Sequence, residues 1–255
     1  MANAVKTKGD NKVATLNMEM FEQDAGAGLD NLGTEDLALP FLKVLSKLSD
    51  ELDEIDGAKP GDILNTVTNT LYKGKVRVVP CAYQRRFIQW QPRGTGSGAP
   101  VSIYNPTDDM PETSRSSEDN KEYLTDGSGD YIEQTCQWYV KVIEEDGTAS
   151  NALIAMKSTQ LKKSRKWMSM IMSRQMTGKN GSFTPPMYSH IYNLSTHAEE
   201  NNKGKWHGWE MAVDKQVDDL NLYNSAKAFA ESVDKGDVNV KHTQEGDNQD
   251  DKTPF

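Results

Sequence analysis

The sequence predicts a mainly β protein: a five-stranded barrel with a helix between its third and fourth strands, then a further helix and an acidic tail. Three observations support this. Apolar runs separated by turn residues begin near residue 62, one basic helical segment interrupts them, and long polar stretches lie outside any core. With 255 residues, of which 36% are hydrophobic, the chain suits one main domain with accessory segments.

The two ends of the chain differ from its middle. Residues 1–34 are polar and glycine-rich without a sustained period, which predicts a flexible arm. Leu37 to Leu48 place apolar residues at helical spacing, so we expect a short packed helix there. The main domain is expected over residues 35–233, and a disordered acidic tail over 234–255.

The first strands follow Asp62. Val76 to Tyr83 and Phe87 to Trp90 are apolar-rich runs typical of strands, and Pro80 favours a bulge that shifts the register. Residues 94–129 run from GTGSG to DGSGD without apolar periodicity. They are expected to form a long solvated loop inserted into the domain.

A hairpin and a basic helix come next. Residues 131–143 and 150–157 are apolar-rich and are joined by Asp146-Gly147, the residues that a tight turn needs. Residues 158–177 then predict a helix that Gly178 can end. The expected apolar face of this helix comprises Leu161, Met168, Ile171 and Met172.

The last elements complete the predicted order. Two β-like runs, Met187 to Leu194 and Lys205 to Val213, precede a helix from about Val217 to Val233. Three strands, a helix and two strands match the order of the oligonucleotide-binding (OB) barrel. An uneven α+β sheet has the same order.

The formal charge of −9 is unevenly distributed. Residues 1–60, 105–130 and 234–255 carry net charges of −6, −6 and −3, so the remainder carries +6. Because the predicted strands are mildly basic, the total charge does not exclude a nucleic-acid partner.

Membrane insertion and secretion are not expected. No run approaches the ~20 apolar residues of a membrane span, and the N-terminus lacks the pattern of a secretion signal. Cys81 and Cys136 lie inside predicted strands without metal-ligand spacing, which predicts buried free thiols.

Enzyme motifs are also missing from the sequence. GTGSG is not followed by Gly-Lys-Ser/Thr, so it is interpreted as a tether rather than a phosphate loop. The acidic pairs Asp108-Asp109 and Asp250-Asp251 fall in segments too mobile to hold a metal or a base. We therefore expect no catalytic site, metal or cofactor. Four histidines show no spacing typical of a metal site: His190, His197, His207 and His242.

Binding of unpaired strands needs cations along a groove and rings on which bases stack. Between Tyr83 and Arg93 the chain interleaves three arginines with three aromatic residues. Alternation places Tyr83, Arg85 and Phe87 on one face of a strand, and Arg86, Ile88 and Trp90 on the other. For each ring, a core position is as good an interpretation as base stacking. The candidate DNA-binding residues here are Arg77, Tyr83, Arg85, Arg86, Phe87, Trp90 and Arg93.

The strand over 131–143 has two unlike faces. One is apolar and predicts a core position for Trp138. The other carries two tyrosines and a lysine, which we favour as DNA contacts, although any polar outer face has the same pattern. These candidates are Tyr131, Tyr139 and Lys141.

Residues 157–179 hold seven lysines and arginines and no acidic residue, which suits attraction to phosphates. The alternative is an ordinary solvated helix face. Trp167 can stack on a base or pack against the barrel, and both interpretations stay open. The candidates from this segment are Lys157, Lys162, Lys163, Arg165, Lys166, Trp167 and Lys179.

The C-terminal sequence HTQEGDNQDDKTPF resembles the tail of bacterial and phage single-stranded DNA-binding proteins, although Lys252 interrupts its acidic run. The resemblance implies a phage protein of the host cytoplasm with a disordered tail that docks on replication proteins such as polymerase, helicase-primase or nuclease. It also implies that the tail can compete with DNA for the basic groove. The implied docking residues are Asp247, Asp250, Asp251, Pro254 and Phe255.

The body also resembles a group of phage proteins connected with DNA replication. The segments that carry this resemblance are LPFLKVL at Leu39 to Leu45, expected as an entry helix, GDILNTVT at Gly61 to Thr68, and VVP…RRFIQW at Val78 to Trp90. The leading hypothesis is a non-enzymatic protein that coats single-stranded DNA and recruits partners; a homo-oligomer is compatible with it. A strand-annealing recombinase and a virion or scaffold protein are the alternatives.

Overall fold

The chain divides into two compact units, Met1–Leu37 and Ala38–Phe255. Among the described residues of the first unit, α1 (Met18–Gln23) is a short helix with no buried side chain. All other elements belong to the second unit. The computed structural model describes residues 18–31, 33, 36–201 and 204–244.

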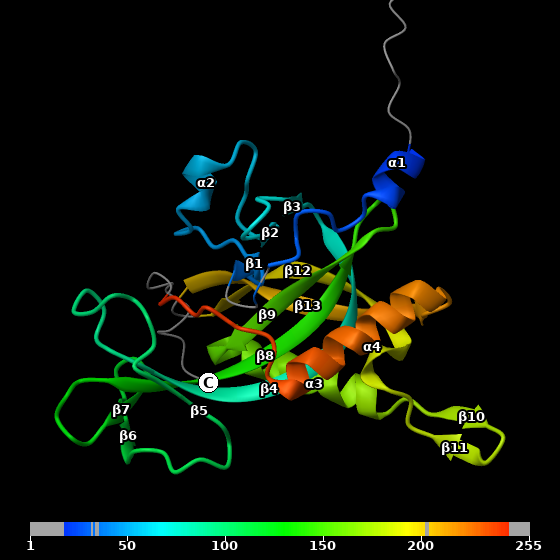
Figure 1. The fold of residues 1–255 in the computed structure, drawn as a ribbon. Coiled ribbons are helices and arrows are strands. Elements are labelled where there is room, and N and C mark those ends of the chain that lie inside the picture. Colours follow the sequence, from blue (N-terminus) through cyan, green and yellow to red (C-terminus); the bar gives the residue numbers. More distant parts are fainter. Residues whose placement is uncertain (1–17, 32, 34–35, 202–203, 245–255) are drawn as a thin grey trace, which may run out of the picture. The chain divides into compact units, whose positions relative to one another are not determined.

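The second unit is mainly β and is built on a curled antiparallel sheet (Figure 1). Its two long central strands pair from Arg77 opposite Ile143 to Trp90 opposite Tyr131. Three further strands extend this pair, and the five lie in the order β13-β12-β4-β8-β9. They are β4 (Lys75–Trp90), β8 (Tyr131–Ile143), β9 (Ala149–Lys157), β12 (His190–Asn201) and β13 (Gly204–Gln216).

Two helices cover opposite faces of this sheet. Helix α3 (Leu161–Met172) packs on the inner face, where Val78 and Trp138 point, and α4 (Leu220–Lys235) packs on the outer face, where Val79 points. For the five long strands, the chain order of three strands, a helix, two strands and a helix agrees with the sequence prediction, while shorter strands lie before and between them.

The edges of the sheet curl toward each other, which gives a half-barrel. The short strand β1 (Leu42–Val44) contacts both edge strands, β9 and β13. On the β9 side, Leu153 N donates to Pro40 O at 2.8 Å. The edges are also joined directly, because Trp209 N of β13 donates to Oε1 of Gln160, which follows β9, at 3.1 Å. A small sheet continues from β1 through β2 (Ile63–Asn65) and β3 (Leu71–Tyr72).

The helix expected between Leu37 and Leu48, including the entry helix at Leu39 to Leu45, is wrong. This segment is extended, and β1 pairs with β2 while Leu42 and Leu45 are buried. The apolar spacing fits either period over so few residues, and pairing with distant strands decides between them. A short helix, α2 (Glu51–Glu54), follows instead.

The insert over 94–129 is mostly turns and loops, as expected, but it contains three short strands. One pairs with the end of β4, and another pairs with the start of β8. Pairing with the long strands therefore orders a segment that lacks apolar periodicity. The strands are β5 (Ser102–Tyr104), β6 (Thr113–Arg115) and β7 (Glu122–Leu124).

Other boundaries differ from the predictions in detail. The two early runs form a single strand, β4, with the expected register shift between Pro80 and Ala82. Helix α3 ends at Met172, well before Gly178. Gly178 lies instead in a small hairpin that projects beside α3 (Figure 1). The remaining short elements are η2 (Ser158–Gln160), β10 (Met176–Gly178), β11 (Gly181–Phe183) and η3 (Met187–Ser189).

A stacked tryptophan pair forms the centre of the inner core. The rings of Trp138 and Trp167 lie 4.2 Å apart at 21°, and both residues are fully buried. Trp138 Nε1 donates to Ser164 Oγ at 2.9 Å, which satisfies its donor in the core. Trp138 is thus a core residue as predicted, but the expected apolar face of α3 is wrong at Met172, which is 59% exposed.

We expect Trp167→Ala to lower the free energy of unfolding by about 3–5 kcal/mol, because it removes a fully buried ring and leaves a cavity beside Trp138. Met172→Ala on the same helix is the control and should cost less than about 0.5 kcal/mol. Urea unfolding followed by circular dichroism measures both; equal effects would contradict the packing of Trp167 in the core.

Candidate nucleic-acid interface

The outer face of β4, β8 and β9 carries several of the polar and aromatic side chains that the sequence singled out. Cross-strand pairing places Arg86 opposite Thr135 and Trp90 opposite Tyr131, with their side chains on this face. Helix α4 covers one end of it, where the Phe229 ring lies 6.2 Å from that of Tyr139. The other end carries the insert.

The chain beyond α4 runs along the same face. Gly236 ends the helix in the left-handed region at φ 82°, which glycine adopts without strain. His242 Nε2 then lies 2.6 Å from Gln137 Nε2, and its ring packs edge-on against Phe41. Gln244 Nε2 donates to Tyr131 Oη at 3.1 Å. Residues 237–244, which we call the terminal segment, therefore reach the far end of the outer face.

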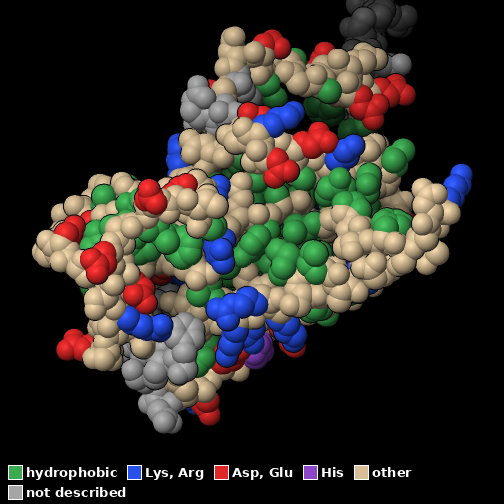
Figure 2. All heavy atoms as spheres, turned by 90° about the horizontal axis from the view of Figure 1, so that it is seen from below, with side chains coloured by type: hydrophobic (Ala, Val, Ile, Leu, Met, Phe, Trp, Pro, Cys, Tyr) green, Lys and Arg blue, Asp and Glu red, His purple; other side chains and the backbone are tan. Residues whose placement is uncertain are grey.

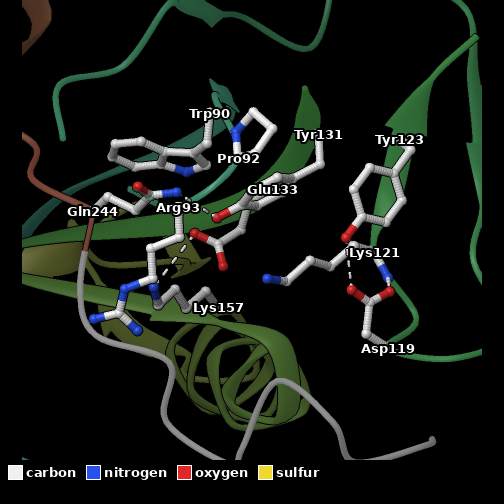
Figure 3. Close-up of a pocket in the computed structure, with 10 residues that line it drawn as sticks. All are labelled: Trp90, Pro92, Arg93, Asp119, Lys121, Tyr123, Tyr131, Glu133, Lys157 and Gln244. Carbon is white, nitrogen blue, oxygen red and sulfur yellow. Dashed lines mark hydrogen bonds and ion pairs between the residues drawn. The ribbon is translucent and has the colours of Figure 1, made fainter. Parts of the chain in front are cut away.

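The terminal segment ends at a hollow between the long strands and the insert (Figure 3). Trp90 and Tyr131 form a cross-strand pair on one side, and Tyr123 from β7 meets Tyr131 edge-on with ring centroids 6.0 Å apart. Lys121 Nζ lies 4.5 Å from the centroid of the Tyr131 ring. The hollow is lined by Trp90, Pro92, Arg93, Asp119, Lys121, Tyr123, Tyr131, Glu133, Lys157 and Gln244.

Charged groups of both signs line this hollow. Lys157 Nζ lies 3.4 Å from Glu133 Oε2 across β9 and β8. Asp119 accepts a hydrogen bond from Tyr123 Oη at 2.7 Å. Partial burial raises the pKa of Asp119, but this bond and the bond from the Lys121 amide outweigh it and bring that pKa below its usual value. The carboxylate therefore stays ionised and fixes the position of the Tyr123 ring.

Three more of the predicted contact residues lie on the inner face of β4. Tyr83, Arg85 and Phe87 share the inner face, as alternation predicts, and Arg85 lies over the Phe87 ring with its Cζ 5.8 Å from the centroid. Tyr83 Oη donates to Cys136 Sγ at 3.2 Å, so this ring is a half-buried neighbour of the core. Figure 2, which views the protein from below, shows a cluster of lysine and arginine side chains near the lower centre of this face.

Helix α3 supplies exposed cations to the inner side, but an acidic residue pairs with two of its lysines. Glu199 on β12 forms an ion pair with Lys163 and lies 3.9 Å from Lys162 Nζ. The same carboxylate accepts from Trp206 Nε1 at 3.1 Å. Arg165 and Lys166 are exposed, and within the part of the chain that the structure describes neither has an acidic partner.

Several predicted contact residues are too buried to serve as stacking or phosphate-binding groups. Trp167 belongs to the core, which decides against base stacking. Tyr139 and Lys141 lie under α4, and burial lowers the pKa of the Lys141 ammonium group. Trp90 and Tyr131 are also buried as residues, but they form walls of the hollow. Alternation correctly gives the face of a side chain but not whether another element covers it.

The remaining candidates are dispersed. Arg93 and Lys157 line the hollow, and Arg86 is half-buried, with its side chain donating to Gln84 Oε1 at 2.7 Å. Arg77 forms an ion pair with Asp214, and Lys179 is exposed on the β10–β11 hairpin. The predicted tail residues Asp247, Asp250, Asp251, Pro254 and Phe255 lie outside the described residues.

Six residues of the hollow were not predicted as site residues: Pro92, Asp119, Lys121, Tyr123, Glu133 and Gln244. Asp119, Lys121 and Tyr123 lie in the insert, whose polar composition predicted a solvated loop. An aromatic residue beside a lysine within that run, at Lys121 to Leu124, was the available signal. Gln244 gave no signal, because its position depends on the path of the terminal segment.

Among the described residues, no group of three or more His, Cys, Asp or Glu side chains is arranged to hold a metal ion. No helix among the same residues is long and apolar enough to cross a membrane. Cys81 and Cys136 are buried free thiols, as predicted.

We expect contact of the terminal segment to weaken in acid. Burial, with Lys157 and Arg86 nearby, lowers the pKa of His242 from 6.5 to about 4. Between these two pKa values the unfolded chain binds a proton at His242 and the folded chain does not. The contribution of the neutral imidazole to the free energy of unfolding is therefore complete above pH 6.5 and is lost as the pH falls toward 4. His242→Gln should remove this pH-dependent contribution to the free energy of unfolding. Urea unfolding of the variant and of the unmodified protein at about pH 7 and pH 5 measures it. The same pH dependence in the two proteins would contradict the prediction.

Comparison with known proteins adds one finding. No curated protein and no solved structure is detectably similar to this chain. The family model described as Pam3 phage gp34-like protein matches residues 7–239, which include the long strands, the insert and both covering helices. The chain therefore belongs to the Pam3 phage gp34-like family.

Proposed function

We propose that this phage-family protein binds single-stranded DNA, coats and protects it during phage DNA replication and recombination, and recruits partner proteins through its acidic C-terminal tail. The observation that carries the proposal is the hollow on the outer face, where three aromatic walls and three cations come together. Stacking surfaces beside cations are what a sequence-tolerant single-strand site requires.

The connectivity of the sheet supports the proposal. The five strands follow one another along the chain as β4, β8, β9, β12 and β13, with α3 after the third, and they lie in the order β13-β12-β4-β8-β9. The OB barrel has the same connectivity, and many OB domains bind oligonucleotides on the outer face of their second and third strands, between adjoining loops. Here those strands are β8 and β9, and the adjoining loop is the insert.

The local charge is also suitable. Three cations and two carboxylates line the hollow, although the whole chain is acidic. Arg85 on the inner side and Arg165 and Lys166 on α3 are further exposed cations. Glu199 screens Lys162 and Lys163, so these two contribute less than the sequence predicted.

The first test is titration of the full-length protein with oligo-dT of about 12 nucleotides at low salt. We expect quenching of tryptophan fluorescence, because Trp90 lines the hollow, and an affinity that falls as salt increases. The variant Arg93→Ala should reduce the salt slope by about one, because one phosphate contact is lost. Lys227→Ala on α4 is the matched control, and no binding at low salt would refute the proposal.

The tail is tested separately. A chain that ends at residue 244 keeps the terminal segment and loses the residues that the resemblance implies for docking. We expect it to bind oligo-dT at least as tightly as the full chain and to lose capture of replication proteins. A truncated chain that captures the same partners equally well would count against the tail.

A further inference from the structure

The centre of the hollow holds a hydrogen-bond acceptor and a donor rather than cations alone. Figure 3 shows the Glu133 carboxylate and the Lys121 ammonium group both pointing into it. The Glu133 side chain is only 14% exposed, and its Oε2 lies 3.4 Å from Lys157 Nζ. A carboxylate has about four lone-pair directions, so an ion pair does not by itself prevent it from accepting hydrogen bonds.

A carboxylate is unfavourable in a site that only binds phosphates, because the two anions repel each other. The hollow instead has the features of a pocket for a base. Its side walls are the rings of Trp90, Tyr131 and Tyr123. Its volume is about 220 Å³, below the range of roughly 300–1,000 Å³ typical for drug-sized ligands, which suits one base and not a stack. Unpaired bases are commonly held between such rings and identified by hydrogen bonds to their edges.

The chemistry of base edges selects among the four bases. On its pairing edge, guanine presents a carbonyl acceptor beside two adjacent N–H donors. Thymine presents one donor between two acceptors, and adenine and cytosine each present a ring-nitrogen lone pair. A carboxylate can accept from both donors of guanine and meets at least one lone pair on every other base, while an ammonium group donates to the guanine carbonyl.

We propose that the hollow takes one unpaired guanine of the bound strand, with Glu133 as the residue that determines this preference. The proposal rests on the proposed function and deepens it. Lys121 donates to the guanine carbonyl, Trp90 and the two tyrosines enclose the base, and Arg93 at the exposed rim contacts the adjoining phosphate. The rest of the strand is bound without regard to sequence.

The experiment compares the full-length protein on oligo-dT of about 12 nucleotides with the same strand carrying one central dG, dA or dC. Fluorescence anisotropy at fixed salt gives the four affinities. We expect the dG strand to bind at least about fivefold more tightly than the other three, since a good bidentate contact discriminates by this much or more. Equal affinities for all four strands would overturn the proposal.

Two variants isolate the carboxylate. In Glu133→Gln the amide has one donor and one acceptor, so the ratio of dG-strand affinity to oligo-dT affinity should fall to about one. Glu133→Asp keeps the charge but withdraws the carboxylate by one methylene, and it should also lose the preference. Glu210→Gln, on the exposed side of β13, is the control.

The outcomes separate the two proposals. A dG preference that survives in both Glu133 variants overturns the assignment of Glu133. Oligo-dT binding without any dG preference in the unmodified protein overturns this inference alone. Failure to bind any of the four strands overturns the proposed function together with it. Circular dichroism of each variant shows that the fold is retained.

Discussion

The continuous pairing of β4 with β8 is the interaction on which the rest of the structure depends. One register shift, between Pro80 and Ala82, interrupts it. Before the shift the even-numbered residues of β4, such as Val78, face the inner core; after it the odd-numbered residues, such as Tyr83, do. A strand without this bulge would direct Trp90 to the inner side and Arg85 to the outer side, because a shift of one residue exchanges the faces. The composition of the hollow therefore depends on a backbone irregularity well before Trp90 in the same strand.

Local pattern was sufficient to predict the elements whose partners are close in sequence. The hairpin of β8 and β9 and the helix α4 appear nearly as predicted, because turn chemistry and periodicity act over a few residues. The helix prediction for Leu37 to Leu48 failed for the opposite reason. Leu42 is buried by the pairing of β1 with β2 and by packing near β9 and β13, all of which are distant in sequence. A short apolar run contains no information about a partner so far along the chain.

The candidate site likewise contains residues that local pattern predicted and residues that depend on distant parts of the chain. Alternation correctly placed Arg86 and Trp90 on one face and Tyr83 and Arg85 on the other. It could not show that α4 covers Tyr139 and Lys141, or that the fully buried Trp167 stacks on Trp138. Nor could it find Lys121 and Tyr123, which enter the hollow only because β7 pairs with the first residues of β8. The polar insert supplies part of the site for that reason.

The hollow is built from parts of unequal rigidity, and this affects how it can bind. Trp90, Tyr131 and Glu133 project from the long central strands, whose paired backbone and buried neighbours hold them in place. Lys121 and Tyr123 depend on a short strand with two paired residues on β8, and Gln244 is held by hydrogen bonds to Tyr131, Gln91 and Gly98. Fewer contacts make a segment easier to move. A ligand therefore meets a fixed acceptor and fixed rings on one side, and on the other a lysine and a glutamine that can adjust to it.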